Sequence, residues 1–155
     1  MSNEDYMRAA LELARQAARE GEVPVGCVVV DEHGKIIGEG RNKREKEHSA
    51  VAHAEIEAIE QGCKKTGSWR LDRCSLYVTL EPCPMCAGAI INSRIKKLCY
   101  GAKDAVSGSC GSVINLFMER YGHEPEIYGG ILEEDCSGIL TDFFKALRGK
   151  EKYGV

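Results

Sequence analysis

The stretch Thr79-Leu80-Glu81-Pro82-Cys83-Pro84-Met85-Cys86-Ala87-Gly88-Ala89 decides the fold. It follows an apolar run, residues 75–79, that is typical of a β-strand, and it leads into an expected helix. Pro84 suits the first helical turn, because the N–H that proline lacks would have no partner there. Cys83 and Cys86 then lie one turn apart at the helix N-terminus, whose partial positive charge favours thiolates.

A second short motif, His53-Ala54-Glu55, lies upstream at the start of another expected helix. An imidazole and two thiolates are ligands that zinc prefers, and three protein ligands leave a fourth position open for water, as in catalytic sites. The spacing H-x-E…P-C-x-x-C is the signature of zinc-dependent nucleobase deaminases. We therefore predict one Zn²⁺ per chain, bound by His53, Cys83 and Cys86, with Glu55 as a proton shuttle that does not bind the metal.

Two other interpretations of these motifs stay open. Cys83 and Cys86 follow a strand and open a helix, which also suits a thioredoxin-like redox pair; His53 and Glu55 would then be a coincidence. A purely structural zinc in an RNA- or protein-binding module would leave a lone C-x-x-C one ligand short. Metal analysis together with a deamination assay separates the three interpretations.

Length and composition suit one globular domain, residues 1–155, with 43% apolar and 29% charged residues. Eight cysteines would suit an oxidised secreted scaffold, but the first 15 residues carry several charges and no apolar signal region. A reducing compartment, and so a cytoplasmic location, is therefore expected. No apolar run approaches membrane-spanning length. The net charge of −3 neither predicts nor excludes nucleic-acid binding, because local patches set phosphate contacts.

The order of expected elements is that of an α/β protein. Ser2 and Asp5 are spaced as a capping box for a first helix that Gly21 can end. The other expected elements are strands 25–31 and 35–40 joined by a hairpin turn, helix 53–64, strand 75–79, helix 84–92, strand 95–101, helix 113–121, strand 126–128 and helix 132–148. Strand–helix–strand spacing around Cys83 predicts a parallel crossover. Glycines 26, 38 and 40 inside strands indicate either bulges or a close approach of substrate.

Polar and basic segments border the expected site. The connection 41–51 ends beside His53 and contains Asn42, whose amide can donate and accept hydrogen bonds toward a base. The loop 104–112 follows the carboxyl end of a strand, where ligands bind in open α/β sheets. Basic residues beside this loop and at the end of the last helix are either solvated or bind phosphates: Arg94, Lys96, Lys97, Lys103, Lys145, Arg148, Lys150 and Lys152.

Segments along almost the whole chain resemble bacterial tRNA-specific adenosine deaminases of the cytidine-deaminase superfamily: Glu22 to Gly26, Asn42, Ala52 to Ile56, Leu76 to Ala89, Gly101 to Asp104 and Asp142 to Phe144. The resemblance implies a three-layer α/β/α fold on a mixed five-stranded sheet, and a homodimer. It also implies hydrolytic deamination of the wobble adenosine in an arginine tRNA anticodon, by attack of a zinc-bound hydroxide on C6. The anticodon stem-loop is then the expected partner.

The resemblance also assigns site residues. His53, Cys83 and Cys86 match the zinc ligands, Glu55 matches the proton shuttle and Asn42 matches a base-contacting asparagine. Other expected substrate-binding positions are Ala54, Pro82, Asp104, Phe144, Lys145 and Arg148. The chain departs from the family pattern at Ala50-Val51 and at Val106, which affects the expected loop shape and phosphate contacts. The alternative function is deamination of a free base or nucleoside, such as guanine or cytosine, on the same fold.

Overall fold

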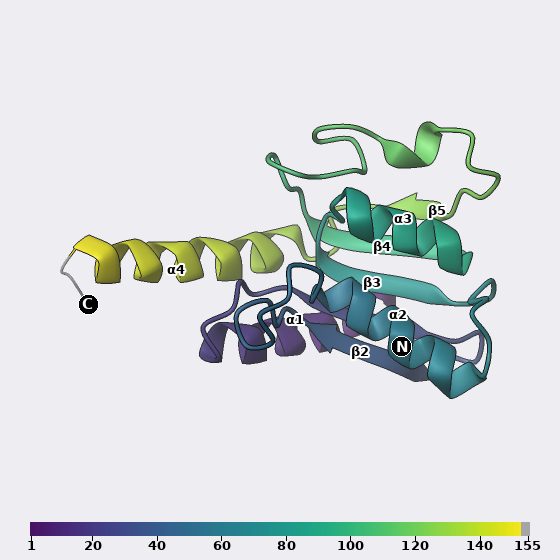
Figure 1. Ribbon diagram of the computed structural model, residues 1–155, viewed down its shortest axis with the longest axis horizontal. Helices are drawn as coiled ribbons and strands as arrows, with labels where there is room; N and C mark the ends of the chain where they lie inside the picture. Colours follow the sequence, from purple (N-terminus) through teal and green to yellow (C-terminus); the bar gives the residue numbers. More distant parts are fainter. Residues whose placement is uncertain (153–155) are drawn as a thin grey trace.

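A five-stranded mixed sheet lies at the centre of the protein, and the computed structural model describes residues 1–152 (Figure 1). The strands are β1 (Gly26–Val30), β2 (Ile36–Arg41), β3 (Ser75–Leu80), β4 (Lys97–Ala102) and β5 (Glu126–Tyr128), in the order β2-β1-β3-β4-β5. β1 is antiparallel to β2 and β3, whereas β3, β4 and β5 are parallel. The predicted hairpin and parallel crossover are therefore confirmed. Residues 153–155 of the predicted domain, and the side chain of Lys152, lie outside the described residues.

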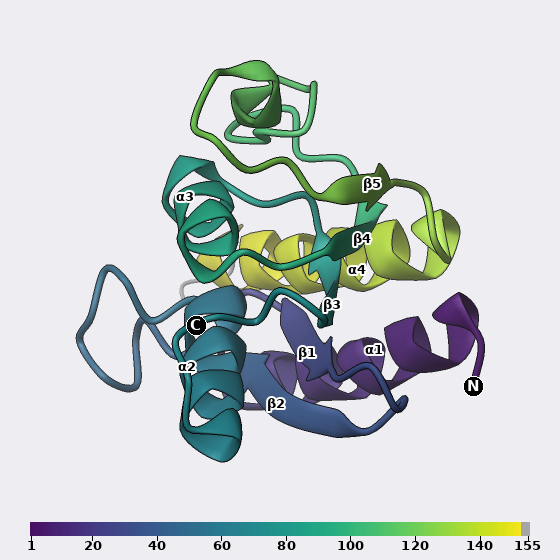
Figure 2. The same ribbon diagram turned by 90° about the vertical axis from the view of Figure 1, so that its right-hand side faces the viewer.

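Helices cover both faces of the sheet (Figures 1 and 2). They are α1 (Asn3–Arg19), α2 (Ala54–Thr66), α3 (Pro84–Ser93) and α4 (Glu133–Lys152). Cys27 and Val29 belong to the core under α2 and α3, while Val28 and Val30 pack under α1 and α4. Every residue of β1 is buried, because successive side chains point to opposite faces and both faces are covered. The predicted three-layer α/β/α fold is confirmed.

The local signals at the helix starts are confirmed. Ser2 Oγ accepts a hydrogen bond from the backbone N–H of Asp5 at 3.2 Å, and the Asp5 carboxylate accepts one from the N–H of Ser2 at 2.8 Å. α1 ends at Arg19, and Gly21 then adopts a positive φ of 81°. Pro84 occupies the first turn of α3, as its missing N–H predicts.

The strand glycines lie against the backbones of helices, which neither predicted reason included. A Cβ atom at Gly38 would lie 2.1 Å from the carbonyl oxygen of Ala58, and one at Gly40 would lie 2.0 Å from that of Ala54. Gly26 contacts the backbone of α1 in the same way. The glycines therefore let helices pack directly on strand backbone, and the prediction of a close substrate approach is wrong. A register irregularity does occur beside Gly38, so a bulge is correct only there.

The predicted helix 113–121 is absent, and a single 3₁₀ turn, Leu116–Met118, takes its place. Phe117 is its one buried side chain, so the segment has no continuous apolar face to drive a longer helix. Asn115 instead caps the turn through its side chain, which accepts from the N–H of Phe117 at 3.1 Å, and pairs with Cys110 in a short bridge. The apolar pattern was therefore misleading in this segment.

α4 begins against the sheet and then extends beyond it (Figure 1). Cys136 near its start is fully buried, whereas Phe144 and Leu147 further along are 39% and 41% exposed. None of the helices described between residues 1 and 152 is long and apolar enough to cross a membrane.

Candidate metal centre and active site

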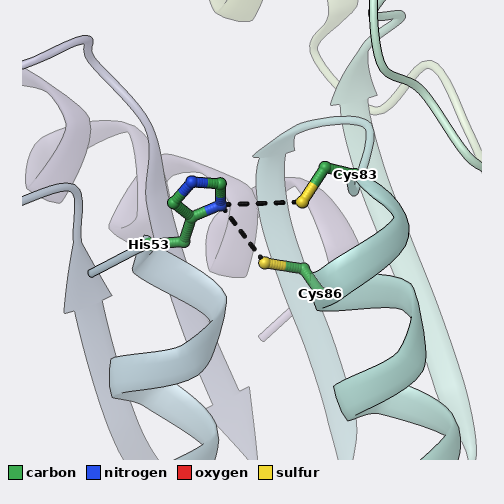
Figure 3. Close-up of side chains that lie close together, drawn as sticks. All are labelled: His53, Cys83 and Cys86. Carbon is green, nitrogen blue, oxygen red and sulfur yellow. Dashed lines mark hydrogen bonds between the residues drawn. The ribbon is translucent and has the colours of Figure 1, made fainter. Parts of the chain in front are cut away.

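α2 and α3 begin side by side, and their first residues form a cluster of three side chains (Figure 3). His53 is the N-cap residue of α2, Cys83 is the N-cap residue of α3, and Cys86 lies one turn further on. The imidazole Nδ1 lies 3.4 Å from Cys86 Sγ and 3.6 Å from Cys83 Sγ. Within the described part of the chain, this is the group of His, Cys, Asp and Glu side chains that can hold a metal ion.

The separations fit a tetrahedral zinc site. Zinc lies about 2.3 Å from a thiolate sulfur and about 2.0–2.1 Å from an imidazole nitrogen, so tetrahedral geometry places a sulfur and a nitrogen ligand about 3.6 Å apart. Both observed Nδ1–Sγ separations lie close to this value. Two sulfurs and one nitrogen are also the donor set of known catalytic zinc sites, which leave one position for water or substrate.

The two thiols are electrostatically coupled. A hydrogen bond from Cys86 lowers the pKa of Cys83 to about 4, against the opposing effect of burial, and His53 contributes in the same direction. The same interaction, with burial, raises the pKa of Cys86 above its ordinary value. Both sulfurs bind zinc as thiolates, so metal binding would release the protons that the two thiols retain.

Glu55 lies in the first turn of α2 and is 4% exposed. It lines a cavity of about 170 Å³ together with His53 and Cys83. Burial raises the pKa of Glu55 to about 7. A carboxyl group with a pKa near neutrality can both accept and donate a proton, which is the property that a proton shuttle requires.

Asn42 lines the same cavity from the end of β2, and its amide is held by the backbone. Its Oδ1 accepts a hydrogen bond from the N–H of Ala54 at 3.1 Å, and its Nδ2 donates to the carbonyl of Val23 at 3.1 Å. An amide has two donor hydrogens and two acceptor lone pairs, so one of each is left for a ligand. The two backbone contacts also determine which side of the amide carries the oxygen.

Backbone groups of two predicted substrate-binding residues already form hydrogen bonds within the protein. The N–H of Ala54 is occupied by Asn42, and Pro82 is buried, with its carbonyl accepting from the N–H of Ser109 at 2.8 Å. Asp104 lines the cavity, and its carboxylate accepts from the N–H groups of Val106 and Ser107. Asp104 thus shapes its own loop.

Phe144 lies on α4, at a second cavity of about 470 Å³. The two cavities share Val23, Asn42 and Arg44, so they adjoin. Phe144 packs edge-to-face on Phe143, with ring centroids 5.4 Å apart. Lys145 and Arg148, on the same helix, are exposed.

The basic residues before β4 do not lie where their sequence positions suggested. Lys97 begins β4 and Lys103 follows its end, so about 17 Å of extended strand separates the two ends. Lys97 donates to the Asn3 side chain at 3.0 Å and lies over the ring of Tyr77. Of this group, Lys103 alone follows the carboxyl end of the strand, next to the cavity loop, and Lys96 precedes the opposite end.

Two buried glutamates near the cavity were not predicted as functional residues. Glu22 and Glu81 are each 2% exposed. Burial raises the pKa of Glu81, but hydrogen bonds from Ser112, Asp104 and Cys110 outweigh that effect and hold the pKa below its ordinary value. A carboxylate between apolar Leu80 and Pro82 was the signal in the sequence that could have identified it.

A histidine and two cysteines at two adjoining helix starts, with a buried glutamate two residues after the histidine, are typical of zinc-dependent deaminases. The family model of MafB19-like deaminases matches residues 1–148. The chain belongs to this family, and within it to the tRNA-specific adenosine deaminases. This membership contradicts the thioredoxin-like and structural-module interpretations.

Two individual comparisons are with tRNA deaminases, and a third is with a deaminase of a free base. The tRNA-specific adenosine deaminase of Bacillus subtilis is 48% identical over 151 residues, which cover 97% of this chain and 93% of the relative. A solved structure from work on A-to-I editing by tRNA:A34 deaminases at the wobble position is 40% identical, with a TM-score of 0.84 over 88% of this chain and 99% of that chain. A guanine deaminase from Bacillus subtilis is 33% identical, with a TM-score of 0.65 over 96% and 95% of the two chains.

Proposed function

We propose that this protein deaminates adenosine to inosine at the wobble position of a tRNA anticodon. The observation that carries the proposal is the His53, Cys83 and Cys86 cluster with Glu55 in the same cavity, in a chain similar to tRNA-specific adenosine deaminases over nearly its full length. An arginine tRNA is the proposed substrate within this class, as the sequence resemblance implies. A cytoplasmic location follows from that substrate.

His53, Cys83 and Cys86 would hold the zinc ion through one nitrogen and two sulfurs. When bound, zinc lowers the pKa of a water molecule from 15.7 toward about 7. Glu55 accepts a proton from the attacking water and delivers it to N1 of the adenine ring. In a second transfer it takes the remaining proton from the oxygen now bonded to C6 and gives it to the amine, which leaves C6 as ammonia. The buried position of Glu55 keeps bulk water from competing for these protons.

Asn42 would orient the base. Its backbone contacts to Val23 and Ala54 hold the amide at the cavity wall, with one N–H and one lone pair free. A fixed amide that donates and accepts discriminates between bases by hydrogen bonding, because an incorrect base leaves a buried polar group unpaired.

The second cavity supports an RNA substrate over a free base. It adjoins the catalytic cavity and is lined by Arg44 and by Phe143 and Phe144 of α4. Anticodon bases are single-stranded, so they can splay apart and stack on aromatic side chains next to the reacting base. Exposed Lys145 and Arg148 on α4 can contact phosphates.

A homodimer is part of the proposal. Its support is a largely apolar groove between α2 and α3 that includes Ile56, Ile59 and Trp69, the last of which is 58% exposed. Light scattering after size-exclusion chromatography tests it; a monomeric mass at micromolar concentration would contradict the homodimer.

The alternative function is deamination of a free base such as guanine or cytosine, and the likeness to a guanine deaminase at a TM-score of 0.65 supports guanine. The decisive experiment incubates the zinc-loaded protein with an adenosine-34 anticodon stem-loop and, separately, with adenosine, guanine and cytosine. We expect inosine in the stem-loop and no ammonia from the free compounds. Ammonia from guanine or cytosine without inosine in RNA would establish the alternative. The Glu55→Ala variant controls for contaminating deaminases.

A further inference from the structure

The buried carboxylate of Glu81 is surrounded by N–H donors from one loop. Its oxygens accept hydrogen bonds from the backbone N–H groups of Asp104 at 3.0 Å, Cys110 at 2.8 Å and Ser112 at 3.2 Å, and from the Ser112 hydroxyl. These donors span residues 104–112, the loop that follows β4 and lines the catalytic cavity. One side chain therefore holds both ends of this loop.

Glu22 has the same relationship to the other loop at the cavity. Its two oxygens accept from the backbone N–H of Glu45 at 3.1 Å and of Lys46 at 2.8 Å. These residues belong to the connection between β2 and α2, which carries Arg44 into the cavity wall. Glu22 precedes His53 in the sequence and Glu81 follows it. Each glutamate contacts one of the two loops that line the cavity together with His53.

Neither carboxylate forms an ion pair with a lysine, arginine or histidine in the part of the chain that the structure describes. A buried carboxylate without a cation is stabilised only by its hydrogen bonds. The loop N–H groups therefore provide the hydrogen-bond donors that water would provide to an exposed carboxylate. The dependence is mutual, because those N–H groups would have no partner of equal strength if the carboxylate were absent.

The loop backbone is shaped to admit Glu81. A Cβ atom at Gly108 would lie 2.4 Å from both Cδ and Oε2 of the Glu81 carboxylate, and 2.5 Å from the carbonyl oxygen of Asp104. Only glycine leaves room for the carboxylate beneath the loop at this position. Ser109 then donates its N–H to the carbonyl of Pro82, directly before the zinc-ligand Cys83.

We propose that Glu22 and Glu81 are positioning residues that hold the two loops of the catalytic cavity, 43–49 and 104–112, in the conformation that receives the substrate adenosine. The proposal rests on the proposed function for its substrate. Glu81 fixes the wall formed by Asp104 and Ser107, and Glu22 fixes the wall formed by Arg44. Neither glutamate takes part in the proton transfers, which belong to Glu55.

Glutamine is the informative replacement, because it keeps the size of the side chain. It offers one acceptor oxygen, and its amide nitrogen would face backbone N–H donors that it cannot satisfy. Hydrogen exchange at single amides measures each loop separately. In Glu81→Gln we expect exchange at Cys110 and Ser112 to accelerate about tenfold or more, with exchange at Glu45 and Lys46 unchanged. In Glu22→Gln we expect the reverse.

Kinetics with the anticodon stem-loop form the second measurement. We expect each variant to bind one zinc per chain and to raise KM about tenfold while kcat changes less, because a loosened loop weakens binding before it affects chemistry. Gly108→Ala should accelerate exchange in the same loop and raise KM as Glu81→Gln does, because the added Cβ displaces the Glu81 carboxylate. It also provides an independent variant if Glu81→Gln fails to fold.

Three results would overturn the proposal: unchanged exchange in the loop that faces the altered glutamate, accelerated exchange throughout the sheet with loss of zinc, or loosened loops with an unchanged KM. If the unaltered protein converts no RNA, the proposed function fails. The exchange measurements then still decide whether each carboxylate holds its loop.

Discussion

Asn42 caps the helix that carries the candidate active site: its Oδ1 accepts the backbone N–H of Ala54, the first residue of α2, at 3.1 Å. The first N–H groups of a helix have no partner within the helix, and the N-cap residue His53 provides no side-chain cap. The cap therefore comes from the end of β2, and this leaves the imidazole of His53 free to face the two cysteines. The Asn42 amide therefore lines the cavity and also caps the first turn of α2.

We predict that Asn42→Ala lowers the free energy of unfolding by about 1–2 kcal/mol, because it removes a helix cap and leaves a buried N–H without a partner. Urea unfolding measures this change. Asn92→Ala is the matched control, since Asn92 is exposed on α3 and should cost less than about 0.5 kcal/mol. Equal losses in the two variants would show that the cap contributes nothing.

Cys86→Ala should abolish zinc binding and activity together, because two remaining ligands do not complete a zinc site. Zinc per chain can be measured by elemental analysis after gel filtration. Cys63→Ala, in α2 and outside the cluster, should keep one zinc. A full zinc content in Cys86→Ala would remove this cysteine from the ligand set.

Glu55→Ala should keep zinc and RNA affinity but lower kcat by about 10²–10⁴-fold, the usual contribution of a general acid–base residue. Glu60→Ala, exposed further along α2, should leave kcat unchanged. Single-turnover inosine formation with saturating protein isolates the chemical step. A rate near that of the unaltered protein would exclude Glu55 as the proton shuttle.

Gly40→Ala should destabilise the protein by about 1–3 kcal/mol, because the new Cβ would overlap the carbonyl oxygen of Ala54 at 2.0 Å and push α2 off the sheet. Thermal unfolding of the metal-free and zinc-loaded forms measures this effect. Gly88→Ala in α3 meets nothing within 4 Å and should stabilise by about 0.5–1 kcal/mol. If both changes had the same sign, direct helix-on-strand packing would not be the reason for Gly40.

Replacing both Lys145 and Arg148 with alanine should weaken binding of the anticodon stem-loop regardless of sequence. Each lost phosphate contact should reduce the log–log salt slope by about 0.7–0.9. The control replaces Lys64 at the end of α2 and Lys96, which lies at the opposite end of β4 from the cavity loop 104–112. Fluorescence anisotropy across a salt series measures the slopes, and identical slopes would remove α4 from the RNA interface.

Local patterns in the sequence were sufficient for most helices and strands and for the placement of Cys83 and Cys86 on one helix face, but they wrongly predicted a helix over 113–121. The capping box of Ser2 and Asp5 and the proline that opens α3 depend on neighbouring residues alone, so they were correct. Cys83 and Cys86 share a helix face because three residues make nearly one turn. Pairing them with His53 needed a known motif, since nothing local relates two helix starts that lie 30 residues apart.

The roles of Gly40, Lys97 and Glu81 were decided by tertiary structure. Gly40 is required because a helix from later in the chain lies on its strand, and Lys97 is far from the cavity because β4 runs its whole length before reaching it. Glu81 precedes Cys83 by two residues, yet its partners come from a loop more than 20 residues later. The spacing of apolar residues in a segment predicts which of its faces is buried. Which residues contact that face depends on segments far away in the sequence, so it cannot be predicted from the segment alone.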